Sequence, residues 1–155
     1  MTMALAALTA AGVFAQTTST TTTRSFSYPP AGLGSSETAQ LTVLNKATAS
    51  SSGAAASCTG SLAFVSVSGA TIGTATSFTV TSGQISSVSL PFSRVGATGL
   101  RTEIVGVVSL TTTSGSNVPC ELVTSLETYD TSSGATHLHL DQNGGLEGPG
   151  PGGRN

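Results

Sequence analysis

The chain has 155 residues, which is enough for one domain with a hydrophobic core of its own. Its formal net charge is only −2 and 37% of its residues are hydrophobic, so the composition excludes disorder of the kind that high net charge drives. Its five Lys and Arg residues are scattered singly, which excludes the clustered positive charge with which proteins bind nucleic acids or anionic membranes.

The first segment, residues 1–15 (MTMALAALTAAGVFA), has the composition of a signal peptide, with a predicted cleavage site between Ala15 and Gln16. Its apolar stretch is shorter than the roughly 20 residues that a membrane-spanning helix needs. The lack of Lys and Arg at its start departs from the usual pattern, and a buried apolar helix is the alternative. No other run is long and apolar enough to be a membrane span. We therefore expect a secreted chain, extracellular or periplasmic, with no membrane span after cleavage.

Residues 16–23 are dominated by Thr and predict an extended, solvated spacer. Residues 142–155 are rich in Gly and Pro and predict a flexible tail. The domain is therefore expected to span residues 24–141.

Within that domain, short apolar runs alternate with Ser-Gly turn signals, and no segment has a convincing helical period. Alternation is clearest at residues 39–43, and residues 104–108 are apolar on both faces, as in a central strand. The pattern predicts an all-β, antiparallel sandwich of seven to eight strands with almost no helix. The expected strands cover residues 24–28, 39–46, 61–67, 77–81, 88–92, 103–111, 121–129 and 136–140.

Two cysteines, Cys58 and Cys120, each precede an apolar strand and lie 62 positions apart. In an exported protein they favour a structural disulfide over a pair of free buried thiols. Such a bond would raise stability by about 4 kcal/mol in the chain-entropy model. A redox role would need a Cys-x-x-Cys motif, which is absent.

The sequence His137-Leu138-His139-Leu140-Asp141 is the one constellation that suggests chemistry. Residues two apart share a face of a strand, so His137, His139 and Asp141 could ligate a metal such as zinc. The alternative is an edge strand with its two leucines inward and its polar residues in water. No Gly-x-Ser-x-Gly elbow occurs, and nothing pairs two carboxylates for acid–base catalysis. We therefore expect no enzyme and no cofactor.

Three segments carry a resemblance: residues 72–92, Ser57-Cys58-Thr-Gly60 and Pro119-Cys120-Glu121-Leu122. Over roughly residues 24–141 the chain resembles small exported bacterial proteins of unassigned function with an immunoglobulin-like β-sandwich. The resemblance implies a fold and a compartment, and it implies no catalytic residue.

Three functions remain open from the sequence. The first is a non-enzymatic secreted or cell-surface sandwich with a structural, adhesive or assembly role, whose partner would be a second copy or a surface glycan or protein. The second is an extracellular module that binds a ligand or glycan through its loops. The third is a metal-dependent enzyme that uses His137 and His139.

Overall fold

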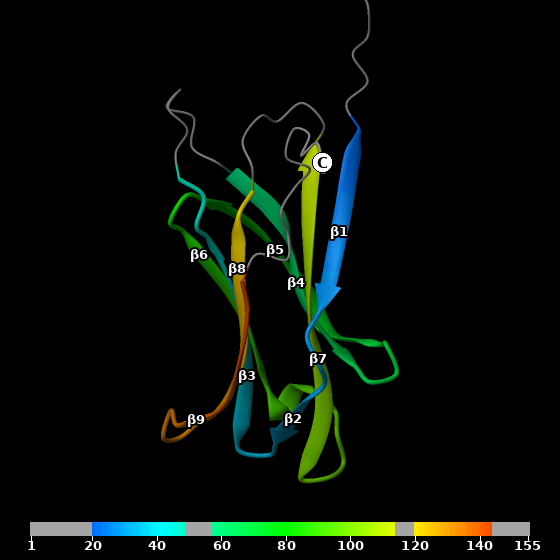
Figure 1. The fold of residues 1–155 in the computed structure, drawn as a ribbon. Helices are drawn as coiled ribbons and strands as arrows, with labels where there is room; N and C mark the ends of the chain where they lie inside the picture. The colour runs from blue at the N-terminus through cyan, green and yellow to red at the C-terminus, as the bar shows by residue number, and fades with distance from the viewer. Residues whose placement is uncertain (1–19, 49–56, 114–119, 144–155) are drawn as a thin grey trace, which may run out of the picture.

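Two antiparallel β-sheets pack face to face in the computed structural model, which describes residues 20–48, 57–113 and 120–143 (Figure 1). Sheet A has the strand order β1-β7-β4-β5, with β2 also paired to β7, and sheet B has the order β6-β3-β8-β9. The strands of sheet A are β1 (Thr21–Ser27), β2 (Ala31–Gly34), β4 (Ser57–Ser66), β5 (Thr71–Thr81) and β7 (Arg101–Thr113). Those of sheet B are β3 (Glu37–Asn45), β6 (Ile85–Pro91), β8 (Leu122–Asp130) and β9 (Thr136–Asn143). The predicted all-β sandwich is confirmed.

The number of strands and the start of β1 differ from the sequence-based expectation. The described residues contain nine strands, not seven to eight, because β2 was not expected. β1 begins at Thr21, so its first three residues come from the stretch expected to be a spacer. The helix in the described ranges is one three-residue 3₁₀ turn, η1 (Phe92–Arg94), and no described helix is long and apolar enough to cross a membrane.

The predicted signal peptide, residues 16–19 of the predicted spacer and residues 144–155 of the predicted tail lie outside the described residues. The expected domain boundaries therefore stay predictions.

Strands β1 and β2 form one interrupted edge of sheet A. From Ser27 to Ala31 the edge advances four residues, whereas its partners on β7 go from Val107 to Ile104, which is three. The extra residue is a bulge at Pro29-Pro30, where neither residue can donate a backbone N–H to the ladder. Because side chains alternate between faces, the bulge keeps apolar residues of β1 and of β2 on the core side.

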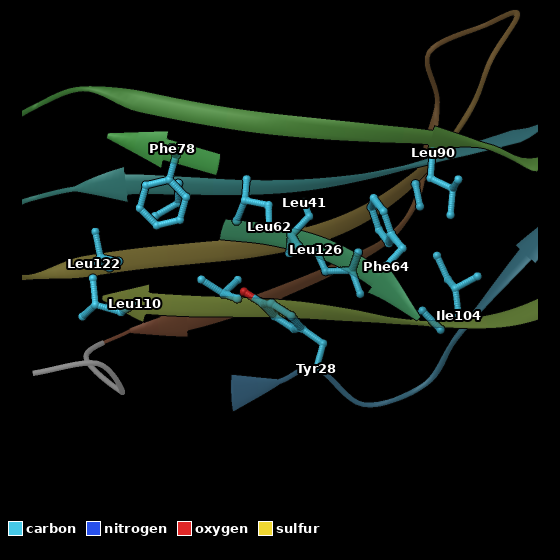
Figure 2. Close-up of a cluster of buried hydrophobic side chains, with 14 of the residues drawn as sticks. Tyr28, Leu41, Leu62, Phe64, Phe78, Leu90, Ile104, Leu110, Leu122 and Leu126 are labelled. Atoms are coloured by element: carbon cyan, nitrogen blue, oxygen red, sulfur yellow. The ribbon is translucent and has the colours of Figure 1, made fainter. Parts of the chain in front are cut away.

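The core lies between the sheets, and buried residues that alternate with less buried ones along β3, β4 and β8 supply much of it (Figure 2). Leu62 and Ile104 of sheet A and Leu41 and Leu126 of sheet B are fully buried. In Figure 2 these side chains interdigitate with the rings of three buried aromatic residues, Tyr28, Phe64 and Phe78. Burial of this apolar surface is what holds the two sheets together.

The disulfide between Cys58 and Cys120 is the covalent link between the sheets, and its prediction is confirmed. Cys58 is the second residue of β4 in sheet A, and Cys120 lies two residues before β8 in sheet B. Their Cα atoms are 5.6 Å apart, within the usual range for a disulfide. Both cysteines are buried, so the bond belongs to the core.

Buried polar groups also connect the sheets. The Tyr28 hydroxyl and the Thr124 hydroxyl are 2.7 Å apart, and Asn45 Nδ2 donates to the Val80 carbonyl at 3.1 Å. Burial raises the pKa of Tyr28 above its ordinary value, although its hydrogen bond to Thr124 acts in the opposite direction. Among the described residues, no buried side-chain polar atom lacks a hydrogen-bond partner. The core therefore contains a few polar side chains, and each buried polar atom of the described side chains has a hydrogen-bond partner.

Candidate functional site

A hollow of about 470 Å³ opens between β2, at the edge of sheet A, and β9, at the edge of sheet B. Its polar lining consists of Glu37, Arg101, Thr128 and His137, and its remaining lining consists of Pro30, Ala31, Gly32, Gly34 and Leu138. Charged groups and apolar surface thus meet in one concave place.

A β-bulge brings His137 into this hollow. Thr128 pairs with Leu138 and Tyr129 with Thr136, so His137 is an extra residue on β9 with no partner position on β8. The imidazole Nδ1 hydrogen-bonds to Oε1 of Glu37, which continues the core-facing positions of β3. A carboxylate can only accept, so Nδ1 carries the proton in this pair.

Both oxygens of Glu37 are hydrogen-bonded. Oε1 is bonded to His137, and Oε2 accepts the backbone N–H of Gly34 at 2.6 Å. These two hydrogen bonds, with a smaller contribution from the Arg101 charge, hold the pKa of Glu37 below its ordinary value, against a partial opposing effect of burial. The Glu37 carboxylate is therefore ionised at neutral pH and already occupied by its own chain.

Arg101 lies against the backbone of β2, where Gly32 leaves room for it. A Cβ atom placed on Gly32 would be only 2.1 Å from Arg101 Nη2, so the guanidinium occupies the space that a side chain would fill. Within the described residues the Arg101 side chain makes no hydrogen bond and no ion pair, and its charge acts on Glu37 at longer range. Its N–H donors are available to a molecule in the hollow.

His139 has different partners from His137. Its Nε2 is 2.8 Å from Asp141 Oδ1, and its Nδ1 is 3.9 Å from Glu127 Oε2, on the outer side of sheet B. The structure therefore brings His139 and Asp141 together, whereas His137 is paired with Glu37. In the part of the chain that the structure describes, no three His, Cys, Asp or Glu side chains are grouped to hold a metal ion. Metal binding by His137, His139 and Asp141 stays a prediction.

The outer face of sheet A carries two rows of hydroxyl groups that cross four strands. The register places Thr23, Thr111, Thr59 and Thr79 in one row, and Ser25, Ser109, Ser61 and Ser77 in the next. Ser25 Oγ and Ser109 Oγ are 2.6 Å apart, so one of these contacts is a hydrogen bond. Neither row contains a charged residue, and both end at β1, the edge strand.

Strand composition did not single out Glu37 or Arg101 as site residues. Glu37 and His137 are 100 positions apart, and Arg101 follows a loop far from both. The nearest signal was the pair of glycines, Gly32 and Gly34, because glycine in a strand often marks the close approach of another group.

Comparisons with protein-family models, with curated proteins and with solved structures find no match.

Proposed function

We propose that this chain is a secreted, non-enzymatic β-sandwich of immunoglobulin-like type that assembles by pairing the β1 edge of sheet A with a further strand. The observation that carries the proposal is the open side of β1, a seven-residue strand with which, in the described ranges, no strand other than β7 pairs. The disulfide supports export, because such bonds persist in oxidising compartments.

The hydrogen-bonding pattern between β1 and β7 leaves the backbone N–H and C=O groups of every second β1 residue on the open side of the strand. Tyr28 N–H donates to the Gly106 carbonyl at 2.9 Å, and bonded pairs alternate along an antiparallel ladder. The residues at odd positions of β1, such as Thr23 and Ser25, therefore direct their N–H and C=O groups away from β7. The four residues at these alternate positions form a template for another strand.

The other edges carry devices that oppose strand addition. β9 has a bulge at His137 and carries the polar side chains of His139 and Asp141. β6 ends in Pro91, which cannot donate a hydrogen bond. On β5 the register jumps from Thr76 to Ile72 while β4 advances two residues, so an irregularity interrupts that edge. β1 has one charge, Arg24, and no interruption before Pro29.

A second copy of β1 is the partner that this edge fits best. Antiparallel pairing centred on Thr23 places each Arg24 opposite a Thr22 and keeps the two guanidinium groups apart. The hydroxyl rows of sheet A would then continue across the junction. Such a contact is isologous and gives a closed dimer rather than an open filament.

Size-exclusion chromatography with light scattering, over a concentration series of the purified full chain, tests this proposal. The test variant is Thr23→Pro, which removes an outward N–H and leaves the bonds to β7 in place. The matched control is Ser87→Pro on β6. Asn45 N–H donates to the Gln84 carbonyl, and bonded pairs alternate along the β3–β6 ladder, so the Ser87 N–H is also directed away from the neighbouring strand.

We expect the wild-type chain and Ser87→Pro to associate as concentration rises, and Thr23→Pro to remain monomeric. Circular dichroism verifies that both variants keep their β-structure. A wild-type chain that is monomeric at every concentration contradicts the proposal, and so does association that Thr23→Pro leaves intact.

A further inference from the structure

We propose that the hollow between β2 and β9 binds a hydroxylated carboxylate, a uronic acid residue, with Arg101 as the residue that receives its carboxylate. This site is separate from the β1 edge and does not depend on assembly. It rests on the Arg101 donors, the arrangement of Glu37 and His137, and the apolar wall beside them.

Arg101 provides the anchor for a negative group. Its planar guanidinium matches a carboxylate with two parallel hydrogen bonds, and within the described residues no ion pair already uses it. Glu37, the carboxylate among the residues that line the hollow, is already bonded through both oxygens, to His137 and to the Gly34 N–H. An incoming carboxylate therefore meets donors on Arg101 that Glu37 does not occupy.

His137 provides a hydrogen-bonding partner for a hydroxyl group. Because its Nδ1 is hydrogen-bonded to Glu37, its Nε2 is the ring nitrogen left for a ligand, and a hydroxyl group can either donate or accept a hydrogen bond there. The imidazole is half-exposed and lines the hollow, so a ligand hydroxyl can reach it. Arg101 and His137 together recognise a molecule that carries both a carboxylate and a hydroxyl.

Pro30 and Leu138 provide apolar surface in the same hollow. The C–H groups of a pyranose ring form an apolar face that packs on such surface, while its hydroxyls remain directed to polar groups. A volume of about 470 Å³ lies within the range of small-molecule sites, roughly 300–1,000 Å³. These features together fit a sugar acid better than a bare carboxylate or a neutral sugar.

Amide chemical shifts of the ¹⁵N-labelled full chain, titrated with glucuronate, test the proposal directly. Methyl glucoside is the neutral counterpart, acetate is the bare carboxylate, and an oligomer of glucuronic acid represents a polysaccharide source. We expect glucuronate to shift the amides of Gly32, Gly34 and Leu138, and to bind at least tenfold more tightly than methyl glucoside or acetate. Tighter binding of the oligomer identifies a polymer as the source, and equal binding identifies the free acid.

Arg101→Gln is the test variant, and Arg94→Gln on η1, outside the lining of the hollow, is the matched control. Arg101 is exposed, so its replacement should leave the fold intact. We expect Arg101→Gln to lower glucuronate affinity about tenfold or more, as loss of a charge-assisted pair does, and Arg94→Gln to leave it unchanged. Equal binding of glucuronate and methyl glucoside, shifts confined to other regions, or full affinity in Arg101→Gln would overturn the proposal.

Discussion

Sheet A and sheet B share one core but differ in the charged and hydroxyl residues that their strands carry. The strands of sheet B carry four carboxylates and two histidines without a Lys or Arg, whereas those of sheet A carry two arginines, one carboxylate and rows of Ser and Thr. The inward side chains of both sheets are equally buried, as Leu62 in sheet A and Leu126 in sheet B illustrate. The core therefore constrains one face of each sheet, and the other face is free to serve solubility or contact.

Breaking the covalent link between the sheets should have the largest effect on stability. Replacing both Cys58 and Cys120 with Ala removes a bond that closes a 62-residue separation and should lower the free energy of unfolding by about 4 kcal/mol. Urea denaturation of the full chain measures this loss, and thiol titration of the denatured, unreduced wild type should find no free thiol. A loss below about 1 kcal/mol would mean that packing alone joins the sheets.

A reciprocal pair of substitutions tests how tightly each sheet is packed. All glycines that lie within described strands belong to sheet A, and at Gly60 an added Cβ would be 2.0 Å from the Ser109 carbonyl oxygen and 2.7 Å from Phe78 Cζ. Phe78 is the cross-strand neighbour of Gly60 and covers it. We expect Gly60→Ala to cost about 2–3 kcal/mol by overpacking, and Ala39→Gly in sheet B about 1 kcal/mol. Equal thermal denaturation midpoints would contradict this difference.

Two hydroxyl contacts, one buried in the core and one exposed on the outer face of sheet A, allow the two environments to be compared. Thr124→Val leaves the buried Tyr28 hydroxyl without its partner and should cost about 1–2 kcal/mol. Ser109→Ala removes the exposed contact with Ser25 and should cost less than about 0.5 kcal/mol. Chemical denaturation of both variants gives the comparison, and a larger loss for Ser109→Ala would assign the hydroxyl rows a structural role.

The loss of folding stability in acid should come from carboxylates of sheet B. Hydrogen bonds from His137 and Gly34 lower the pKa of Glu37, and those from Ser132 and Ser133 lower the pKa of Asp130. A lowered folded-state pKa contributes stability that is complete above the unfolded-state value, near 4.5 for Glu37, and is lost as the pH falls through the folded-state value.

Urea denaturation at stepped pH values from 7 to 3 measures this contribution. We expect Glu37→Gln and Asp130→Asn each to lower stability at neutral pH and to flatten the decline of stability in acid. An unchanged pH dependence in both variants would show that other groups control acid unfolding.

The sequence predicted the layers of the fold better than its edges. Alternation indicated β3 and β8, because buried and half-buried residues alternate from Ala39 to Asn45 and from Leu122 to Thr128. β2 was not expected because Pro29 and Pro30 before it, and two glycines within its four residues, are typical of a turn. Those residues form a strand because they pair with β7. A pairing between segments about 70 positions apart cannot be recognised from the residues of either segment alone.

The candidate site was predictable only in part, for the same reason. Strand periodicity groups His137 with His139, but the bulge on β9 directs His137 to Glu37 instead. No residue type marks that bulge in advance. The hydroxyl rows were equally hidden, because they depend on a strand order that departs from the order of the chain.

The disulfide also determines how the molecule would bear tension. A force applied through β1 and β9, the first and last described strands, pulls on strands at the edges of opposite sheets. Once they peel away, the load passes through Cys58 and Cys120 and bypasses everything between them. The 62-residue separation then withholds about 210 Å of contour length from extension. Reduction would release that length, so the redox state of the surroundings determines how far the stretched domain can lengthen.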